Sequence, residues 1–122
     1  MTARTVAHVY ALGRLGLGCA LVATPSFAAR PWLGDAADAP GTRAVVVGFG
    51  ARDVGIALGT LTALWSGRGA TGWLRAGMVS DAADLVGTWM ERDALPRMAG
   101  PGVAAMAAGG VLCSAWLQSR LD

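Results

Sequence analysis

The chain of 122 residues contains no lysine, because all ten of its basic residues are arginine. This absence excludes Schiff-base chemistry, a retinal linkage and a lysine nucleophile. Histidine occurs once, and the two cysteines, Cys19 and Cys113, lie in separate apolar runs without a CxxC or CxxCH motif. No nucleophile with its base, metal-ligand set or cofactor motif can be assembled from these residues. An enzyme is therefore the least expected class, and the sequence predicts no catalytic residue, metal site or cofactor.

Charge is also scarce, since only 15% of the residues are charged, whereas 54% are hydrophobic and 18 are glycine. This composition is too apolar and too rich in glycine for an ordinary soluble domain of this length. The net charge of +2 is too small to indicate nucleic-acid binding, and no arginine cluster interleaved with aromatic residues occurs. The composition predicts that the partner of this protein is the lipid bilayer and not a nucleic acid.

Four apolar stretches have lengths suited to crossing a membrane. At about 1.5 Å per residue, residues 43–65 extend about 34 Å, which exceeds the ~30 Å of a hydrocarbon core. We therefore expect an all-α protein, a four-helix transmembrane bundle that forms a single domain over residues 1–122. The predicted spans, which polar connections separate, are residues 5–23, 43–65, 73–90 and 101–118.

The connection between the first two spans, residues 24–42, is rich in proline and glycine. It predicts a polar loop in which a short interfacial helix begins at Pro25, with Thr24 as its cap.

A secretory signal is the alternative interpretation of the first span. Arg4 precedes an apolar stretch, and Ser26-Phe27-Ala28 suits signal peptidase. Arg14 interrupts the apolar core that such a signal needs, which favours the transmembrane interpretation.

The tryptophans test the spans without the use of hydropathy. Aromatic residues with a polar atom gather at the two membrane interfaces, whereas in a soluble bundle they more often lie in the middle of a helix. All five tryptophans lie at predicted span ends: Trp32, Trp65, Trp73, Trp89 and Trp116. Their placement favours a bilayer.

The arginines do not decide the orientation, because each side of the predicted bundle holds four of them. The acidic residues of the connections gather on the side opposite the termini: Asp35, Asp38, Glu91 and Asp93. This asymmetry favours cytoplasmic termini in a multi-pass protein of the inner (plasma) membrane, with dual insertion as the alternative.

Charged residues recur within three of the spans at a similar depth. Arg14, Arg52 and Asp81 each lie about nine residues into a span, or about 13–14 Å deep. A charge at the centre of a spanning helix costs roughly 2.5–3.5 kcal/mol on insertion scales, so these residues need partners. We expect a midplane charge network in which the two arginines pair with Asp81 and Asp84, with Asp81 as the expected partner of Arg52.

Asp53 points about 100° away from Arg52 on the same helix. The expectation for Asp53 is a neighbouring hydroxyl, His8 or another subunit. Two interpretations of the whole network follow. A structural network that fixes helix register makes the protein an accessory or structural subunit, whereas a polar cavity for a proton, an anion or a small polar molecule makes it a small oligomeric transporter or channel.

Small residues share one face of the second span. Gly48, Gly55 and Gly59 lie on the same side of the helix as Arg52, and the last two form a GxxxG motif that lets another helix approach closely. Four short spans with many small residues make a thin bundle. We therefore expect a homo-oligomer or assembly into a larger membrane complex.

Short motifs are spread over nearly the whole chain: Gly13-Arg14 in the first span, Gly50-Ala51-Arg52-Asp53 with Gly55 and Gly59 in the second, and Asp81 in the third. In these motifs the chain resembles a group of uncharacterised small four-helix membrane proteins common in high-GC bacteria, which are loosely similar to DoxX-like proteins. The resemblance implies a four-helix membrane fold and, because the group is a domain of unknown function, implies no activity.

Overall fold

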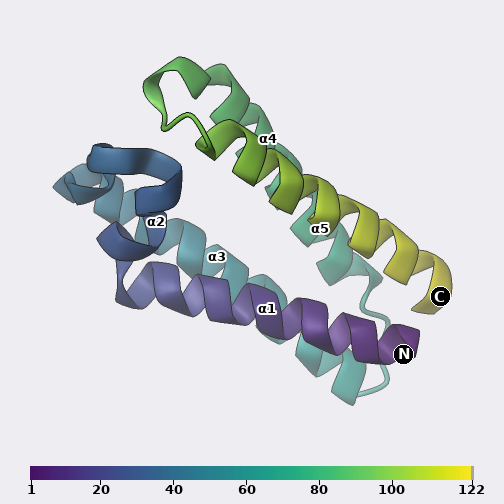
Figure 1. Cartoon of the computed structure of the whole chain (residues 1–122). Coiled ribbons are helices and arrows are strands. Elements are labelled where there is room, and N and C mark those ends of the chain that lie inside the picture. The colour runs from purple at the N-terminus through teal and green to yellow at the C-terminus, as the bar shows by residue number, and fades with distance from the viewer. Residues whose placement is uncertain (122) are drawn as a thin grey trace.

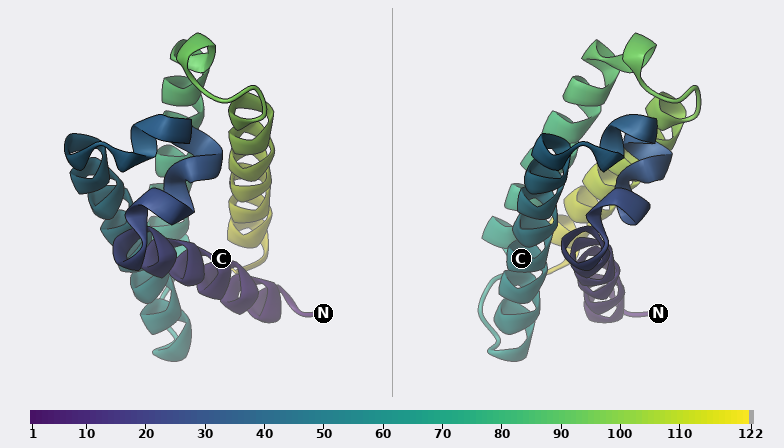
Figure 2. Two further views of the ribbon diagram at one scale, coloured as in Figure 1. Left: turned by 60° about the vertical axis from the view of Figure 1, so that its left-hand side comes forward. Right: turned by 90° about the vertical axis from the view of Figure 1, so that its left-hand side faces the viewer.

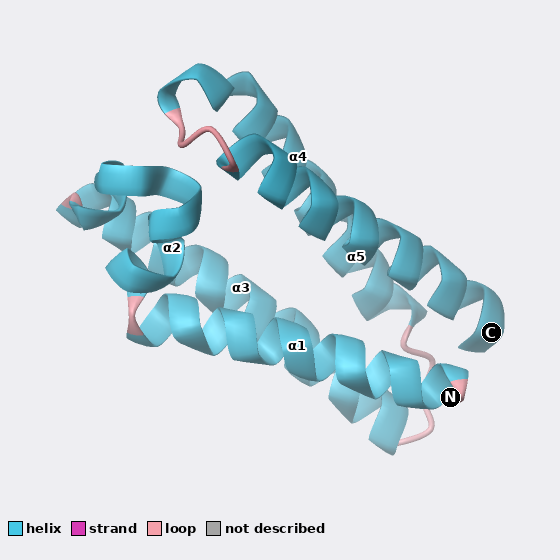
Figure 3. Ribbon diagram, in the orientation of Figure 1, coloured by secondary structure: helices cyan, strands magenta, loops and turns pink. Residues whose placement is uncertain are grey.

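The computed structural model of the chain describes residues 1–121, and these residues are helical almost throughout, with no strand among them (Figure 3). The predicted all-α class is therefore confirmed. The elements are five α-helices and two short 3-10 helices (Figure 1), in the order α1 (Ala3–Ala23), α2 (Pro25–Leu33), η1 (Gly34–Asp38), α3 (Pro40–Trp65), α4 (Thr71–Met90), η2 (Arg92–Ala94) and α5 (Ala99–Leu121).

Three of these helices, α1, α3 and α5, are long and apolar enough to cross a membrane, which suggests a membrane protein. Helix α4 is not among the three, although it has 20 residues, and it carries Arg75, Asp81 and Asp84. The predicted count of four spanning helices is therefore reached only if α4 crosses the membrane together with its charges.

The long helices begin two or three residues before the predicted spans. Local chemistry accounts for these starts, because the Thr2 hydroxyl accepts a hydrogen bond from the amide of Thr5 at 3.2 Å, and Pro40 occupies the first turn of α3, where its missing N–H is not needed. Helix α5 also ends later than predicted, at Leu121. Trp116 consequently lies five residues before the end of its helix and not at the end.

The short helix predicted at Pro25 is confirmed as α2, and Thr24 stands at its N-cap position as predicted, but the Thr24 side chain does not cap it. The hydroxyl of Thr24 donates to the carbonyl oxygen of Ala20 at 2.9 Å, so it closes the end of α1 and makes no cap hydrogen bond to α2. Arg30 of α2 binds Asp38 of η1 at 2.6 Å. This hydrogen bond raises the pKa of the exposed Arg30 guanidinium above its ordinary value.

The four long helices form two antiparallel pairs, α1 with α3 and α4 with α5 (Figures 1 and 2). Apolar side chains bury at two places along them. One buried cluster contains residues from α1, α3, α4 and α5, among them Ala7, Leu64, Leu74 and Leu117. The other is formed where α2 and η1 pack against α1 and α3, and it contains Leu21, Ala29, Ala37 and Val46. The charged residues in the middle of α1, α3 and α4 lie between these two apolar regions.

The backbones of α1 and α3 approach each other closely at a glycine pair that the sequence analysis did not single out. A Cβ atom added to Gly18 would lie 2.7 Å from the carbonyl oxygen of Gly50, and one added to Gly50 would lie 2.7 Å from the carbonyl oxygen of Gly18. Only glycine allows the two backbones to lie this close.

The glycines predicted to pack a partner helix behave differently from one another. The ring of Trp73 in α4 occupies the space where a Cβ of Gly59 would lie, so this glycine packs within the chain. Gly48 and Gly55 have no neighbour within 4 Å of an added Cβ. Within residues 1–121, the GxxxG motif therefore makes a close helix contact at Gly59 and none at Gly55.

Candidate functional site

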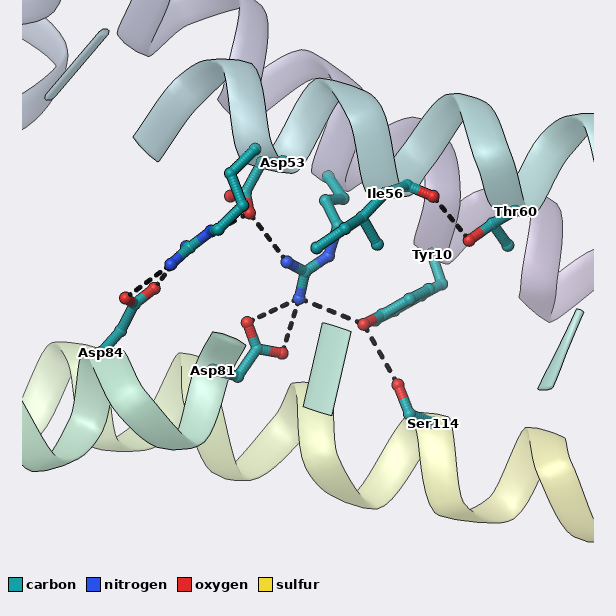
Figure 4. A network of polar contacts seen from close by, with 9 residues as sticks. Tyr10, Asp53, Ile56, Thr60, Asp81, Asp84 and Ser114 are labelled. Carbon is teal, nitrogen blue, oxygen red and sulfur yellow. Dashed lines mark hydrogen bonds and ion pairs between the residues drawn. The ribbon is translucent and has the colours of Figure 1, made fainter. Parts of the chain in front are cut away.

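The structure brings the five predicted charged residues together in one cluster. Arg14 comes from the middle of α1, Arg52 and Asp53 from the middle of α3, and Asp81 and Asp84 from the middle of α4. Figure 4 shows the three carboxylates facing the space between these helices. We call this group the charge cluster.

Arg14 joins three helices. Its Nη2 atom donates to both carboxylate oxygens of Asp81, at 2.5 and 2.6 Å, and its Nη1 atom donates to Asp53 Oδ1 at 2.9 Å. Nη2 also donates to the hydroxyl oxygen of Tyr10, one turn earlier on α1, at 3.2 Å. The Arg14 side chain is only 8% exposed, so these contacts are made largely out of reach of solvent or lipid.

Arg52 pairs with Asp84, and the expectation that it pairs with Asp81 is wrong. Its Nη1 and Nη2 atoms donate to the two oxygens of Asp84 at 3.0 and 2.7 Å, in the parallel two-bond geometry that arginine and carboxylate favour. The guanidinium also lies over the ring of Phe49, 5.0 Å from its centroid. Arg14 already occupies the oxygens of Asp81, which leaves Asp84, one turn further along α4, for Arg52.

The expectation for Asp53 is also wrong, because its partners are the arginines of its own chain. Its Oδ1 atom accepts from Arg14 at 2.9 Å and from Arg52 at 3.3 Å. The 100° offset from Arg52 turns Asp53 toward α1, which lies close to α3 at the glycine pair. His8 is occupied elsewhere, since its Nδ1 atom donates to the carbonyl oxygen of Arg4 at 2.7 Å.

Three uncharged residues that the sequence analysis missed, Tyr10, Gly110 and Ser114, connect the charge cluster to α5. The hydroxyl of Ser114 donates to the Tyr10 hydroxyl oxygen at 3.1 Å (Figure 4). Gly110, one turn before Ser114, lies directly against the Asp81 carboxylate, in the space that a Cβ would need. The only signal in the sequence was a serine within a predicted span that carries no charge. Helix α5 therefore contributes the Ser114 hydroxyl to the charge cluster and leaves space at Gly110 for the Asp81 carboxylate, but it contributes no charged side chain.

A cleft of about 600 Å³ opens onto the charge cluster, and all five charged residues line it. Its remaining walls are mostly apolar and come from α1, α2, α3 and α5, with Val9, Leu17, Trp32, Phe49, Val103 and Met106 among the lining residues. The α2 wall is held to α4 by Trp32, whose Nε1 donates to the Thr88 hydroxyl at 2.9 Å. The cleft thus joins an apolar volume to a charged surface deep in the helical bundle.

Hydrogen-bonding capacity within the charge cluster is incompletely used. The Nε atoms of Arg14 and Arg52 are buried and donate to no atom of residues 1–121. No hydrogen bond from the described part of the chain reaches the second oxygen of Asp53, Oδ2. Within that part of the chain, no group of three or more histidine, cysteine or acidic side chains is arranged to hold a metal ion.

Comparison of the chain with models of protein families, with curated proteins and with solved structures gives no match. The function is therefore inferred from the chemistry of the charge cluster and the cleft.

Proposed function

We propose that this protein is an integral membrane protein that binds a small amphipathic molecule in the cleft between its helices. The observation that supports binding most directly is that the apolar walls of a cleft of about 600 Å³ end on five charged side chains. Ligand sites of this size combine apolar walls with a few polar groups that fix the ligand's orientation. Ionisable residues at this depth in a membrane protein commonly mark a binding site or pathway.

The proposal takes α4 as a fourth membrane crossing. Its 20 residues extend about 30 Å, the thickness of the hydrocarbon core. Asp81 and Asp84 are each paired with an arginine, which lowers the cost of placing them in the bilayer. Arg75 is the fifth residue of α4, close enough to the helix end for its long side chain to reach the interface. Both termini then lie on one side, which we propose is the cytoplasmic side of the plasma membrane.

The cleft proposal predicts that filling the cleft abolishes binding. Gly13 lines the cleft and has no neighbour within 4 Å of an added Cβ, so Gly13→Leu should fill the cleft without strain in the helices. The measurement is the binding of three radiolabelled probes with the same decyl chain, decyltrimethylammonium, decanol and decyl sulfate, to the protein in lipid nanodiscs. We expect Gly13→Leu to weaken binding of the tightest probe at least tenfold.

Gly16 provides the matched control, because it lies in the same helix, also has open space at its Cβ and does not line the cleft. Gly16→Leu should bind every probe as the unchanged protein does. If Gly13→Leu and Gly16→Leu retain equal affinity for all three probes, the cleft is not a binding site. Flux of a bound probe across liposomes would further define the protein as a small transporter.

A structural or accessory subunit is the second candidate, and the open glycine face of α3 favours it. Gly48 and Gly55 lie seven residues apart, on one side of the helix, and an added Cβ at either would meet no atom of the described residues within 4 Å. We propose that they pack against a second copy or a partner subunit, since small residues let transmembrane helices approach closely.

This oligomer proposal predicts that Gly48→Leu with Gly55→Leu lowers the mass of the detergent-solubilised particle, measured by light scattering. The control is Gly87→Leu in α4, where an added Cβ also meets open space, and it should leave the mass unchanged. A monomeric mass for the unchanged protein and for both variants would contradict assembly through this face.

A further inference from the structure

We infer that the ligand of the cleft carries a single positive charge, as an amine or quaternary ammonium group attached to an apolar chain or ring. This inference deepens the proposed binding function and rests on it.

The charge balance of the cleft is the first support. Its lining contains two guanidinium groups and three carboxylates, and no other charged side chain, so its net charge is 2 − 3 = −1. An uncompensated charge away from water is strongly unfavourable. A monocation would bring the net charge to zero, whereas an anion would bring it to −2.

The unused acceptor is the second support. Asp53 lines the cleft, its side chain is only 8% exposed, and its Oδ2 atom receives no hydrogen bond from the described residues. A protonated amine can donate to this oxygen, and a quaternary ammonium can neutralise it. The unused Nε–H groups of Arg14 and Arg52 would suit an anion, but the two carboxylates that each arginine already contacts oppose one.

The aromatic lining is the third support. Tyr10, Trp32 and Phe49 line the cleft, and cations are attracted to the faces of such rings. Arg14 already lies over Tyr10, and Arg52 over Phe49. No arginine of the described chain lies over Trp32, whose ring is tilted against that of Phe49 at 5.6 Å. The indole of Trp32 is therefore available to an ammonium group that enters the cleft.

The test compares the three decyl probes in their cleft-dependent binding. Cleft-dependent binding is the binding that Gly13→Leu abolishes. Decyltrimethylammonium should bind at least tenfold more tightly than decanol, and decyl sulfate should bind most weakly. Asp84→Asn makes the charge of the cleft neutral, so it should reduce the preference for the cation over decanol to about twofold or less, while Asp84→Glu should keep the preference.

A further variant covers the case in which Asp84→Asn does not fold. Trp32→Leu removes the free aromatic face and should lower the affinity for decyltrimethylammonium at least threefold more than the affinity for decanol. Equal affinity for the cation and decanol would overturn the inference, as would tightest binding of decyl sulfate. Equal affinity for the cation and decanol would mean that a bound proton, and not a ligand, balances the charge of the cleft. With either of these two results the cleft remains a binding site. Absence of cleft-dependent binding for all three probes would instead remove the proposed function itself.

Discussion

Replacement of Arg14 by leucine should destabilise the protein severely, and the additional replacement of Asp81 by leucine should restore much of the loss. Arg14 joins α1 and α3 to α4 through its bonds to Asp53 and Asp81, and its removal leaves Asp81 without a salt-bridge partner. Breaking a buried ion pair in this way typically costs about 3–5 kcal/mol. Removal of both charged groups is often neutral or stabilising, because no buried charge is then left without a partner.

The measurement is a double-mutant cycle on thermal unfolding in detergent. The matched control pairs Arg14→Leu with Asp84→Leu, since Asp84 belongs to the same charge cluster but bonds to Arg52. We expect a coupling free energy toward the upper end of the usual range of about 0.5–3 kcal/mol for Arg14 with Asp81, and a clearly smaller one for Arg14 with Asp84. Equal coupling in the two pairs would show that the carboxylates respond to net charge and not to the observed pairing.

The helices could be predicted from the sequence because their signals are local. Apolar runs of suitable length, bounded by proline and glycine, gave the four long helices and the short helix at Pro25. The observed helices begin earlier than the predicted spans because capping and the first turn depend on single contacts, such as that of Thr2 with Thr5. Helix α4 was counted as a span from its length, although its charges keep it outside the three helices that are apolar enough on their own.

The charge cluster could be predicted only as a set of residues at one depth. Depth follows from counting along a helix, whereas the choice of partner depends on which helices are neighbours and how each is rotated. Arg52 and Asp81 have matching depths, yet Asp81 bonds to Arg14 and Arg52 bonds to Asp84. The sequence leaves a hydroxyl, His8 or another subunit as the partner of Asp53, because nothing in its own helix shows that α1 lies beside it.

The sequence indicates a polar cavity at the charged residues as one interpretation, but it holds no signal for the apolar walls of the cleft. These apolar walls come from four helices, α1, α2, α3 and α5, and the α2 wall depends on the hydrogen bond between Trp32 and Thr88, which are 56 residues apart in the chain. Trp32 was interpreted as a residue of the membrane interface, a role that its position in α2 allows but does not require. Such contacts become visible only when the arrangement of the helices is known.

The glycine pair of α1 and α3 carries the second large expected effect. Gly50→Ala should destabilise the protein by about 1–3 kcal/mol, the usual cost of adding an atom to a tightly packed interior. The added Cβ would lie 2.7 Å from the carbonyl oxygen of Gly18 and 2.8 Å from Cβ of Leu21, and neither atom can move away without a shift of the α1 backbone. Because Arg14 and Asp53 face each other across the same pair of helices, that shift should also lengthen their ion pair.

Gly16→Ala is the matched control, since Gly16 lies in α1, two residues before Gly18, and has open space at its Cβ. It should leave stability unchanged or raise it by up to about 1 kcal/mol, because alanine favours a helix over glycine. Thermal unfolding in detergent measures both effects. Gly18→Ala should resemble Gly50→Ala, and the double variant should lose less than the sum of the two, because helices that have already separated accommodate the second methyl group. Equal stability of Gly16→Ala and Gly50→Ala would contradict the close contact of α1 with α3.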